Sequence, residues 1–337
     1  MCSAPLIFGC SGKLLSNEEY EFFKSVKPYG FILFDRNISD PHQVRCLSQT
    51  LREAVGSPAA PIFIDQEGGR VARLRPPHWR TTPSAKSLVE KFCNDPELIC
   101  RLVRLNSRLI AHDLINSGIS VSCMPVLDLV SQGAHEVIGD RAYGSDPEKV
   151  SLYGGAACQG LLEGGVLPVI KHIPGHGRAT LDSHLALPRI DAGIEELERT
   201  DFSPFRELRQ MPMAMTAHVL FSAVDPVRPA TMSCNVVSHI IRRLIGFDGL
   251  LITDDISMGA LTGTLSQRAR GALSAGCDLV LHCNGILAEM KEVAMSIDPM
   301  SDITRDRVRR CQSLPSTKPS AIDFAEDLRE LDELLAR

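Results

Sequence analysis

Residues 166–177 read VLPVIKHIPGHG, and this stretch changes in its middle from apolar to polar. Its first five residues form a short apolar run, which is typical of a β strand buried on both faces. Its last seven include a lysine, two histidines, a proline and two glycines, which is typical of a bent loop whose side chains titrate near neutral pH. Residues 182–184, Asp-Ser-His, follow closely. The stretch predicts a buried strand whose carboxyl end carries a functional loop, with a plain surface loop as the simpler alternative.

The same alternation recurs along the chain. Further apolar runs predict strands at residues 5–9, 30–34, 61–64, 119–123, 213–216, 249–253 and 277–282. Helical patterns separate them at residues 16–25, 40–54, 95–116, 147–163, 192–209, 233–245, 265–275 and 286–296. In the first helix, Ser16 and Glu19 are spaced as a capping box. Eight strand–helix alternations in one chain predict an α/β fold, a closed (β/α)8 barrel of the TIM type, with an open α/β sheet as the alternative.

The domain organisation follows from the end of the chain. No linker divides residues 1–312, which are predicted to form a single catalytic barrel domain. A Pro- and Ser-rich break at residues 313–320 precedes a helical pattern at residues 323–336. Because leucines recur in this pattern, residues 313–337 are predicted to be a linker and a helix that packs on the barrel.

Composition limits the partners and the compartment. The net charge is −5 and no run of Lys or Arg occurs, which argues against a nucleic-acid partner or an anionic membrane surface. The 11 cysteines are scattered without a C-x-x-C pair, as expected of reduced thiols. No apolar run reaches the ~18 residues that span a membrane, and the start does not resemble a signal peptide. A cytoplasmic protein without a cofactor is predicted; the sequence does not indicate its oligomeric state.

Polar residues gather where five predicted strands end. These clusters contain Asp65 to Arg73, Asp128 with Arg141, Lys171 to His184, His218, and Asp254 with Asp255. Because the carboxyl ends of barrel strands meet on one face, the clusters predict one active site.

Each cluster has a simpler interpretation. Either Asp254 or Asp255 could cap the next helix, so one of the two is assigned that role and the other is kept for chemistry. Arg73 and Arg141 could be surface ion-pair residues. Three histidines and an aspartate could bind a divalent metal, although Lys171 would repel a cation next to its neighbouring histidine.

Three motifs together resemble glycoside hydrolase family 3, and more narrowly its single-domain bacterial β-N-acetylglucosaminidases. They are DQEGGRV at residues 65–71, KHIPGHG at residues 171–177 with DSH at 182–184, and TDDISM at residues 253–258. The segments FILFDRN at residues 31–37 and IGDR at residues 138–141 fit the same group, and the resemblance runs in order from about residue 6 to 297. One departure is GCSG at residues 9–12, where the family commonly has an aspartate before the loop glycine.

The resemblance implies a role for each matching residue. Asp254 would be the nucleophile that forms a covalent glycosyl-enzyme, and His184, paired with Asp182, would be the general acid/base. The hydroxyls of the terminal sugar would be held by Asp65, Arg73, Arg141, Lys171 and His172, while His176 would brace the loop. The residue types suit these roles, because imidazole titrates near neutrality and a neighbouring carboxylate favours its protonated form. Asp182 and His184 can pair only on a bent loop, since alternate residues of a helix point apart.

The predicted function is that of a retaining exo-β-N-acetylhexosaminidase. Its substrate, as the resemblance implies, would be a small oligosaccharide or muropeptide, the GlcNAc–anhydro-muramyl fragment of cell-wall turnover. Within the family, the alternatives are a β-glucosidase or xylosidase and a glycoside phosphorylase. From other classes, they are a metal-dependent amidohydrolase barrel and a sugar-binding protein without catalysis. Trp79, the sole tryptophan, is expected either to stack on a sugar or to plug a loop.

Overall fold

The structure is a computed structural model that describes residues 3–92, 95–131, 133, 138–314 and 323–336. Eight parallel strands close into a barrel in which each strand pairs with its neighbours along the chain and the last pairs with the first. The strands are β1 (Ala4–Gly9), β2 (Pro28–Leu33), β3 (Ile62–Ile64), β4 (Val121–Ser122), β5 (Leu167–Ile173), β7 (Met213–Thr216), β9 (Leu250–Asp255) and β10 (Leu279–His282). The predicted closed barrel is confirmed, and the open sheet is excluded by the β1–β10 pairing.

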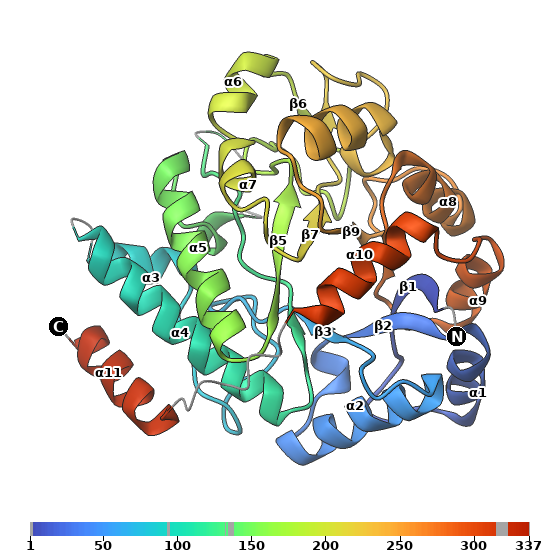
Figure 1. Cartoon of the computed structure of the whole chain (residues 1–337), viewed down its shortest axis with the longest axis horizontal. Helices are drawn as coiled ribbons and strands as arrows, with labels where there is room; N and C mark the ends of the chain where they lie inside the picture. Colours follow the sequence, from blue (N-terminus) through green and yellow to red (C-terminus); the bar gives the residue numbers. More distant parts are fainter. Residues whose placement is uncertain (1–2, 93–94, 132, 134–137, 315–322, 337) are drawn as a thin grey trace.

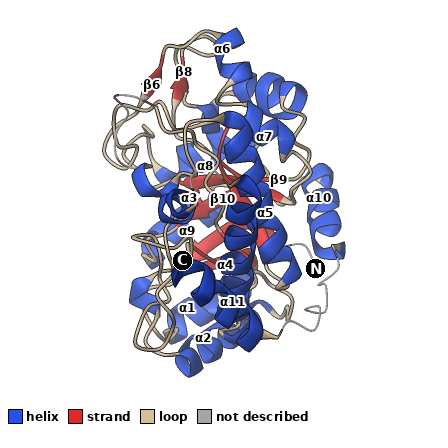
Figure 2. Ribbon diagram, turned by 90° about the vertical axis from the view of Figure 1, so that its left-hand side faces the viewer, coloured by secondary structure: helices blue, strands red, loops and turns tan. Residues whose placement is uncertain are grey.

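Helices surround the barrel (Figures 1 and 2). The predicted ones are α1 (Asn17–Val26), α2 (Pro41–Val55), α4 (Pro96–Asn116), α5 (Pro147–Glu163), the π-helix η4 (Val236–Leu244), α8 (Leu265–Ala275) and α9 (Leu287–Met295). Ser16 caps α1 and forms the predicted capping box with Glu19. Residues of alternate strand positions, such as Ile7 and Phe8, face the barrel interior and the helices respectively, so the apolar runs are buried on both sides.

Four expectations about individual elements need correction. The helix expected at residues 192–209 is two short helices, α6 (Ile194–Arg199) and α7 (Ser203–Glu207), because the backbone leaves the helical region at Thr200, with a φ of −116° and a ψ of −91°. Pro204 lies in the first turn of α7, where its missing N–H is tolerated. The short helix α3 (Ala85–Lys91) was not predicted. α9 does not close the fold, because α10 (Asp302–Ser313) follows it. β5 and β9 are longer than predicted, so that Lys171, His172, Asp254 and Asp255 belong to strands and not to loops.

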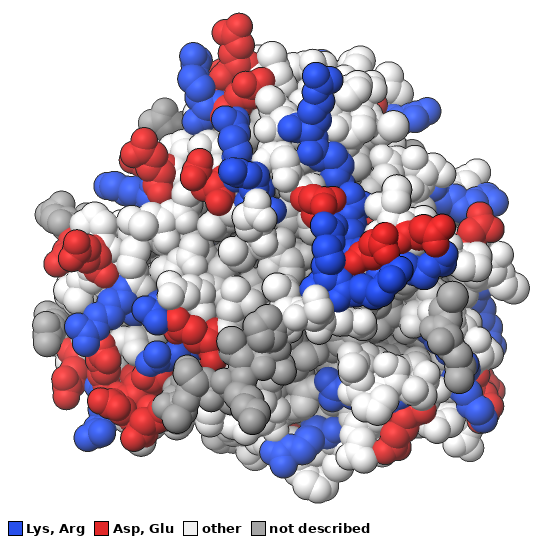
Figure 3. All heavy atoms as spheres, viewed as in Figure 1, with Lys and Arg blue, Asp and Glu red and all other residues white. Residues whose placement is uncertain are grey.

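α10 lies across the middle of the barrel in Figure 1. It is held there by Arg307, which bonds to the buried Asp278 at 3.0 Å and to Asp248 at 2.9 Å. On this face, a connected run of basic side chains lies over α10, with acidic side chains directly beside it (Figure 3). Because Arg307 reaches Asp278, which directly precedes β10, α10 lies at the amino-terminal end of the barrel. The opposite end is left open.

The remaining elements lie outside the barrel wall. Short 3-10 turns form η1 (Asp35–Asn37), η2 (Gly139–Arg141) and η3 (Ala230–Met232). A separate parallel pair joins β6 (Arg189–Ile190) to β8 (Leu220–Phe221). The last helix, α11 (Phe324–Ala336), packs on α4, where Arg108 pairs with Asp327 and Phe324 stacks on His112 at 3.9 Å. Of the Pro- and Ser-rich break predicted at residues 313–320, residues 315–320 lie outside the described residues.

Two findings concern the described residues as a whole. The nine cysteines among the described residues are all free thiols, and six of them are buried. No described helix combines the length and the apolar character that crossing a membrane requires.

Candidate active site

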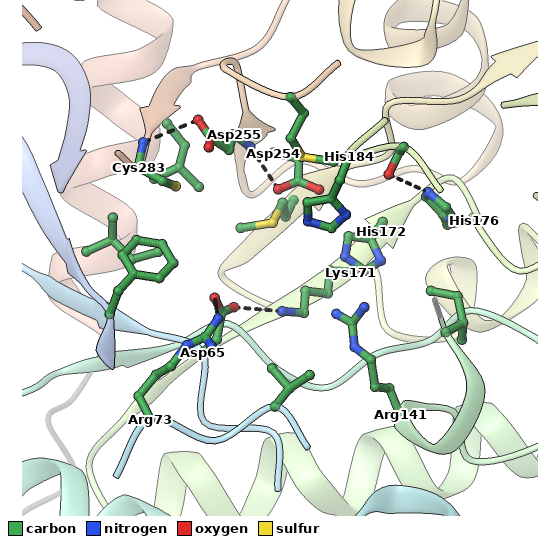
Figure 4. A pocket seen from close by; sticks show the side chains of 18 residues that line it. Asp65, Arg73, Arg141, Lys171, His172, His176, His184, Asp254, Asp255 and Cys283 are labelled. Atoms are coloured by element: carbon green, nitrogen blue, oxygen red, sulfur yellow. Dashed lines mark hydrogen bonds and ion pairs between the residues drawn. The ribbon is translucent and has the colours of Figure 1, made fainter. Parts of the chain in front are cut away.

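A pocket of about 300 Å³ opens at the carboxyl ends of the barrel strands (Figure 4). Seven of the eight predicted site residues line it: Asp65, Arg73, Arg141, Lys171, His172, His184 and Asp254. The eighth, Asp182, is hydrogen-bonded to His184. Residues as far apart in the sequence as Asp65 and Asp254, separated by 189 positions, therefore come together, as the motif placement predicts.

One side of the pocket is a network of buried charges. Lys171 Nζ lies 2.9 Å from Asp65 Oδ1 and 2.6 Å from Glu67 Oε1. Glu67 also accepts two hydrogen bonds of 2.8 Å from the Arg141 guanidinium, and Arg73 reaches Asp65 at 3.3 Å. Burial would raise the pKa of Asp65, but the cations of Lys171 and Arg73 outweigh it and lower that pKa. Burial opposes ionisation of Glu67 too, yet Arg141 and Lys171 lower its pKa from 4.5 to about 2. All these groups are charged at neutral pH.

Glu67 received no role from the sequence. It lies in the same motif as Asp65, two residues further on, but its partner Arg141 is 74 positions away. The structure shows that Arg141 and Lys171 are not surface residues: their side chains are 12% and 3% exposed. Glu67 holds both cations at the pocket wall.

Asp128 organises the end of β5. Its Oδ2 accepts a 2.6 Å bond from His172 Nδ1, and its Oδ1 accepts the backbone N–H groups of His172 at 3.3 Å and of His176 at 2.7 Å. Since a carboxylate only accepts, His172 carries a proton on Nδ1 and keeps Nε2 for another partner. The sequence placed Asp128 at a strand end without a role, and this orienting role was missed.

His176 lies next to the loop that carries His184. Its Nε2 lies 3.0 Å from Ser183 Oγ. Burial, together with the neighbouring His172, lowers the pKa of His176 to about 4. His176 is therefore neutral at physiological pH and suited to bracing the loop, not to carrying a proton in the reaction.

Asp182 and His184 form the expected short pair. Asp182 Oδ1 accepts from His184 Nδ1 at 2.7 Å and from the backbone N–H of His184 at 2.9 Å. The pair fixes the tautomer, because Nδ1 must hold the proton that the carboxylate accepts. Nε2 is then the atom that can exchange a proton with a ligand. Figure 4 shows the imidazole of His184 pointing into the pocket beside Asp254.

The two aspartates at the end of β9 differ in their surroundings. Asp255 accepts from Ser257 N–H at 3.0 Å, from Ser257 Oγ at 2.6 Å and from the N–H of Cys283 at 3.2 Å. It thus fixes a turn, whereas α8 is capped by Thr264, so the expectation that one aspartate caps the next helix was wrong in that detail. Asp254 lines the pocket and accepts the backbone N–H of Asp255 at 2.8 Å.

Asp254 is held in its ionised form. Burial would raise the pKa of its carboxyl, but His218, His172 and the N–H of Asp255 lower it below its ordinary value. His218 is itself buried, with Nε2 donating to the carbonyl of Asp255 at 3.0 Å and Nδ1 lying 2.7 Å from Thr231 Oγ1. It fixes the end of the strand that bears Asp254.

The structure decides between the two roles expected of Trp79. Trp79 is buried, 9% exposed, in the core between barrel and helices and does not line the pocket, which supports the plug and not the stacking face. Phe34 does line the pocket, with the Arg73 guanidinium 5.4 Å from its ring centre. Phe34 directly precedes η1 and carried no signal of this role in the sequence.

The loop at residues 9–12 is held from α1 and η1. Ser11 donates to Glu19 through its N–H at 2.8 Å and its Oγ at 3.0 Å. Asn37 Nδ2 donates to the carbonyls of Cys10 at 3.1 Å and Gly12 at 2.8 Å. At this departure from the family pattern, a carboxylate reaches the loop from the neighbouring helix.

His172, His176 and His184 each bond to a different side chain, and no group of three or more His, Cys, Asp or Glu in the described ranges is arranged to hold a metal ion. These bonds suit the three histidines to proton transfer and hydrogen bonding.

An ionised carboxylate at a barrel strand end, a proton-transfer pair facing it and a wall of charged hydrogen-bonding groups are the features of a glycoside hydrolase. Comparison with known proteins agrees. Residues 13–314 match the family model of the glycosyl hydrolase family 3 N terminal domain, and the chain belongs to this family.

Within this family, the chain is similar to proteins named β-hexosaminidase or β-N-acetylglucosaminidase. The Beta-hexosaminidase of Alkalilimnicola ehrlichii is 39% identical over 310 residues, which cover 90% of this chain and 88% of that protein. The crystal structure of NagZ from Neisseria gonorrhoeae in complex with N-trifluoroacetyl-D-glucosamine superposes with a TM-score of 0.89 at 30% identity and covers 99% of both chains. The family 3 β-N-acetylglucosaminidase from Paenibacillus sp. str. FPU-7 gives a TM-score of 0.85 at 29% identity, covering 98% of this chain and 67% of that one.

Proposed function

We propose that this glycoside hydrolase is a retaining exo-β-N-acetylhexosaminidase that uses Asp254 as nucleophile and His184, with Asp182, as acid/base. The observation that carries the proposal is that Asp254 and His184 line one pocket. Asp182 holds the Nδ1 of His184, which leaves Nε2 for proton transfer. The names of the relatives and the glucosamine analogue bound by the gonococcal neighbour support the sugar.

The first step forms the glycosyl-enzyme. A carboxylate oxygen of Asp254 attacks the anomeric carbon as the glycosidic C–O bond breaks, and the proton on His184 Nε2 passes to the departing oxygen. Asp182 stabilises the imidazolium that must be present before this transfer, and it orients the ring. The low pKa of Asp254 keeps its attacking oxygen unprotonated.

The second step reverses the proton transfer. Neutral His184 removes a proton from water, the water oxygen attacks the anomeric carbon from the face that the aglycone left, and the bond to Asp254 breaks. Two inversions at one carbon give net retention.

The charged wall holds the terminal sugar. Asp65, Arg73, Arg141, Lys171 and His172 offer charge-assisted hydrogen bonds to its hydroxyls. Because their positions are fixed by mutual ion pairs, little side-chain entropy is lost on binding.

The proposed natural substrate is a GlcNAc–anhydro-muramyl fragment of cell-wall turnover in the cytoplasm. The printed names of the relatives support the N-acetylhexosamine part of this substrate, and the anhydro-muramyl part is what the resemblance of the sequence motifs implies. Release of free GlcNAc from a purified GlcNAc–anhydro-muramyl peptide, in preference to chitobiose, would support it. Equal or better cleavage of chitobiose would contradict it.

The nucleophile is tested by Asp254→Asn with p-nitrophenyl β-GlcNAc as substrate. Turnover is expected to fall at least ~10³-fold with the thermal midpoint retained, because an amide does not attack. Asp306→Asn, at an exposed position of α10, is the matched control and should keep full activity. Wild-type turnover by the Asp254→Asn variant would contradict the proposal that Asp254 is the nucleophile.

The acid/base is tested by His184→Gly on aryl GlcNAc substrates of different leaving-group pKa. Phenyl β-GlcNAc needs proton donation and should lose ~10²-fold or more, while 2,4-dinitrophenyl β-GlcNAc, a good leaving group, should lose little in its first step. Equal losses on both substrates would assign His184 a structural role.

A further inference from the structure

The loop that carries Asp182 and His184 is fixed at both ends. At its start, Arg178 Nε bonds to Asp201 Oδ2 at 2.6 Å and its guanidinium also reaches Glu196 at 2.6 Å. At its end, β6 pairs with β8 outside the barrel. Between these anchors, the His184 side chain is 62% exposed, so burial of the side chain does not hold its position.

Two backbone hydrogen bonds hold the tip of the loop. The N–H of Gly259 donates to the carbonyl of His184 at 3.1 Å, and the N–H of Ala260 donates to the carbonyl of Ser183 at 3.1 Å. Gly259 and Ala260 belong to the turn that follows β9, five and six residues after Asp254. The segment that bears Asp254 therefore also bonds the residue proposed as acid/base.

Gly259 permits this approach because it has no side chain. A Cβ at this position would lie 2.8 Å from the carbonyl oxygens of both His184 and Leu185. These are backbone atoms and cannot swing aside as the end of a long side chain can. Gly259 is not among the glycines with positive φ, so its backbone conformation is open to alanine. The space occupied by the loop, and not backbone strain, requires glycine there.

We propose that Gly259 is a positioning residue for His184: its N–H, with that of Ala260, holds the tip of the loop so that His184 Nε2 faces the glycosidic oxygen above Asp254. The proposal rests on the proposed function, in which His184 is the acid/base. Because the donors lie in the turn that leads away from Asp254, five and six residues after it, they set the separation between nucleophile and acid/base. A methyl group at residue 259 would push the loop, and His184 with it, away from the pocket.

Gly259→Ala should act on proton donation selectively. For phenyl β-GlcNAc, kcat/KM is expected to fall ~10- to 100-fold, because donation from His184 is needed to release the phenol. For 2,4-dinitrophenyl β-GlcNAc the fall should stay below ~3-fold. The wall that binds the sugar is untouched, so inhibition by free GlcNAc should be unchanged. If Gly259 had a merely structural role, kcat/KM would fall by the same factor for both substrates.

Gly193→Ala is the matched control. Gly193 precedes α6 with a φ of −69°, and a Cβ there would meet no atom within 4 Å. Both substrates should be cleaved at wild-type rates by this variant. His184→Gly, measured beside it, separates the two proposals: if it does not discriminate between the leaving groups, the proposed acid/base is wrong. If it discriminates and Gly259→Ala does not, only the role of Gly259 is wrong.

Hydrogen exchange in the unmodified protein tests the same contacts without a variant. Gly259 is exposed, so its amide should exchange at nearly the rate of a free peptide unless the carbonyl of His184 accepts it. Protection of the Gly259 and Ala260 amides is expected. Exchange of both at the free-peptide rate would overturn the proposal even if Gly259→Ala proved too unstable to assay.

Discussion

Glu67→Gln should destabilise the protein by an amount that the geometry fixes. The Glu67 side chain is 6% exposed and bonds to Arg141 at 2.8 Å and to Lys171 at 2.6 Å. The pKa of its carboxyl lies at about 2 instead of 4.5, a displacement worth about 3 kcal/mol at neutral pH. Gln keeps the shape of the side chain but removes its charge, so that Asp65 is left as the nearest anion for Lys171. Loss of one partner of a buried ion pair costs about 3–5 kcal/mol.

The pH dependence has a definite sign. Because the folded pKa of Glu67 lies below the unfolded one, its stabilisation is complete above pH 4.5 and is lost as the pH falls toward 2. Urea unfolding of wild type and Glu67→Gln should therefore differ by about 3 kcal/mol at pH 7, and by less than half of that at pH 3.

Glu21→Gln is the matched control for this measurement. Glu21 pairs with Lys24 on the surface with its side chain 66% exposed, so its loss should change the free energy of unfolding by less than about 0.5 kcal/mol. A difference below about 1 kcal/mol for Glu67→Gln at pH 7, or one that does not shrink in acid, would refute the reasoning.

Three further predictions concern other buried groups. Asp128→Asn removes the carboxylate that fixes His172, so kcat/KM for p-nitrophenyl β-GlcNAc should fall ~10- to 100-fold with the fold retained by circular dichroism; full activity would contradict the orienting role. The pKa of His176 is about 4 in the folded protein and 6.5 in the unfolded chain, so the folded state loses stability relative to the unfolded state as the pH falls from 6.5 to 4. In His176→Gln, the free energy of unfolding in urea should therefore fall less over this pH range than in the wild type, by up to about 3 kcal/mol. Arg307→Met should lower the free energy of unfolding by about 1–3 kcal/mol, because the buried Asp278 loses one of its cations; an unchanged urea midpoint would show that α10 does not depend on this pair.

The barrel could be predicted because parallel strands buried on both faces are visible as short apolar runs. The positions at which these strands end could not be predicted as well. Lys171 and His172 continue β5, where Lys171 pairs with Met215, and Asp254 continues β9. Polar residues at a strand end look like loop residues until the neighbouring strand is known. α10 was not predicted because its sequence is mainly polar, and its position depends on the pairing of Arg307 with Asp278.

The site could be predicted where one motif contained the chemistry. Asp182 and His184 are two positions apart, so their pairing follows from local geometry. Glu67 and Asp128 have their partners 74 and 44 positions away, and only the closed barrel brings these together. The contact of Gly259 with the His184 loop is of the same kind, since nothing in the sequence near Gly259 indicates what approaches it.

The central claim is that Asp254 becomes covalently bound to the sugar. A 5-fluoro derivative of GlcNAc carrying a good leaving group slows both steps but the second more, so that the glycosyl-enzyme accumulates. Proteolysis and mass spectrometry of the inactivated protein should find one sugar per chain, on Asp254. A label on Asp255 or on any other residue, or slow turnover of the inhibitor without any covalent species, would contradict the account.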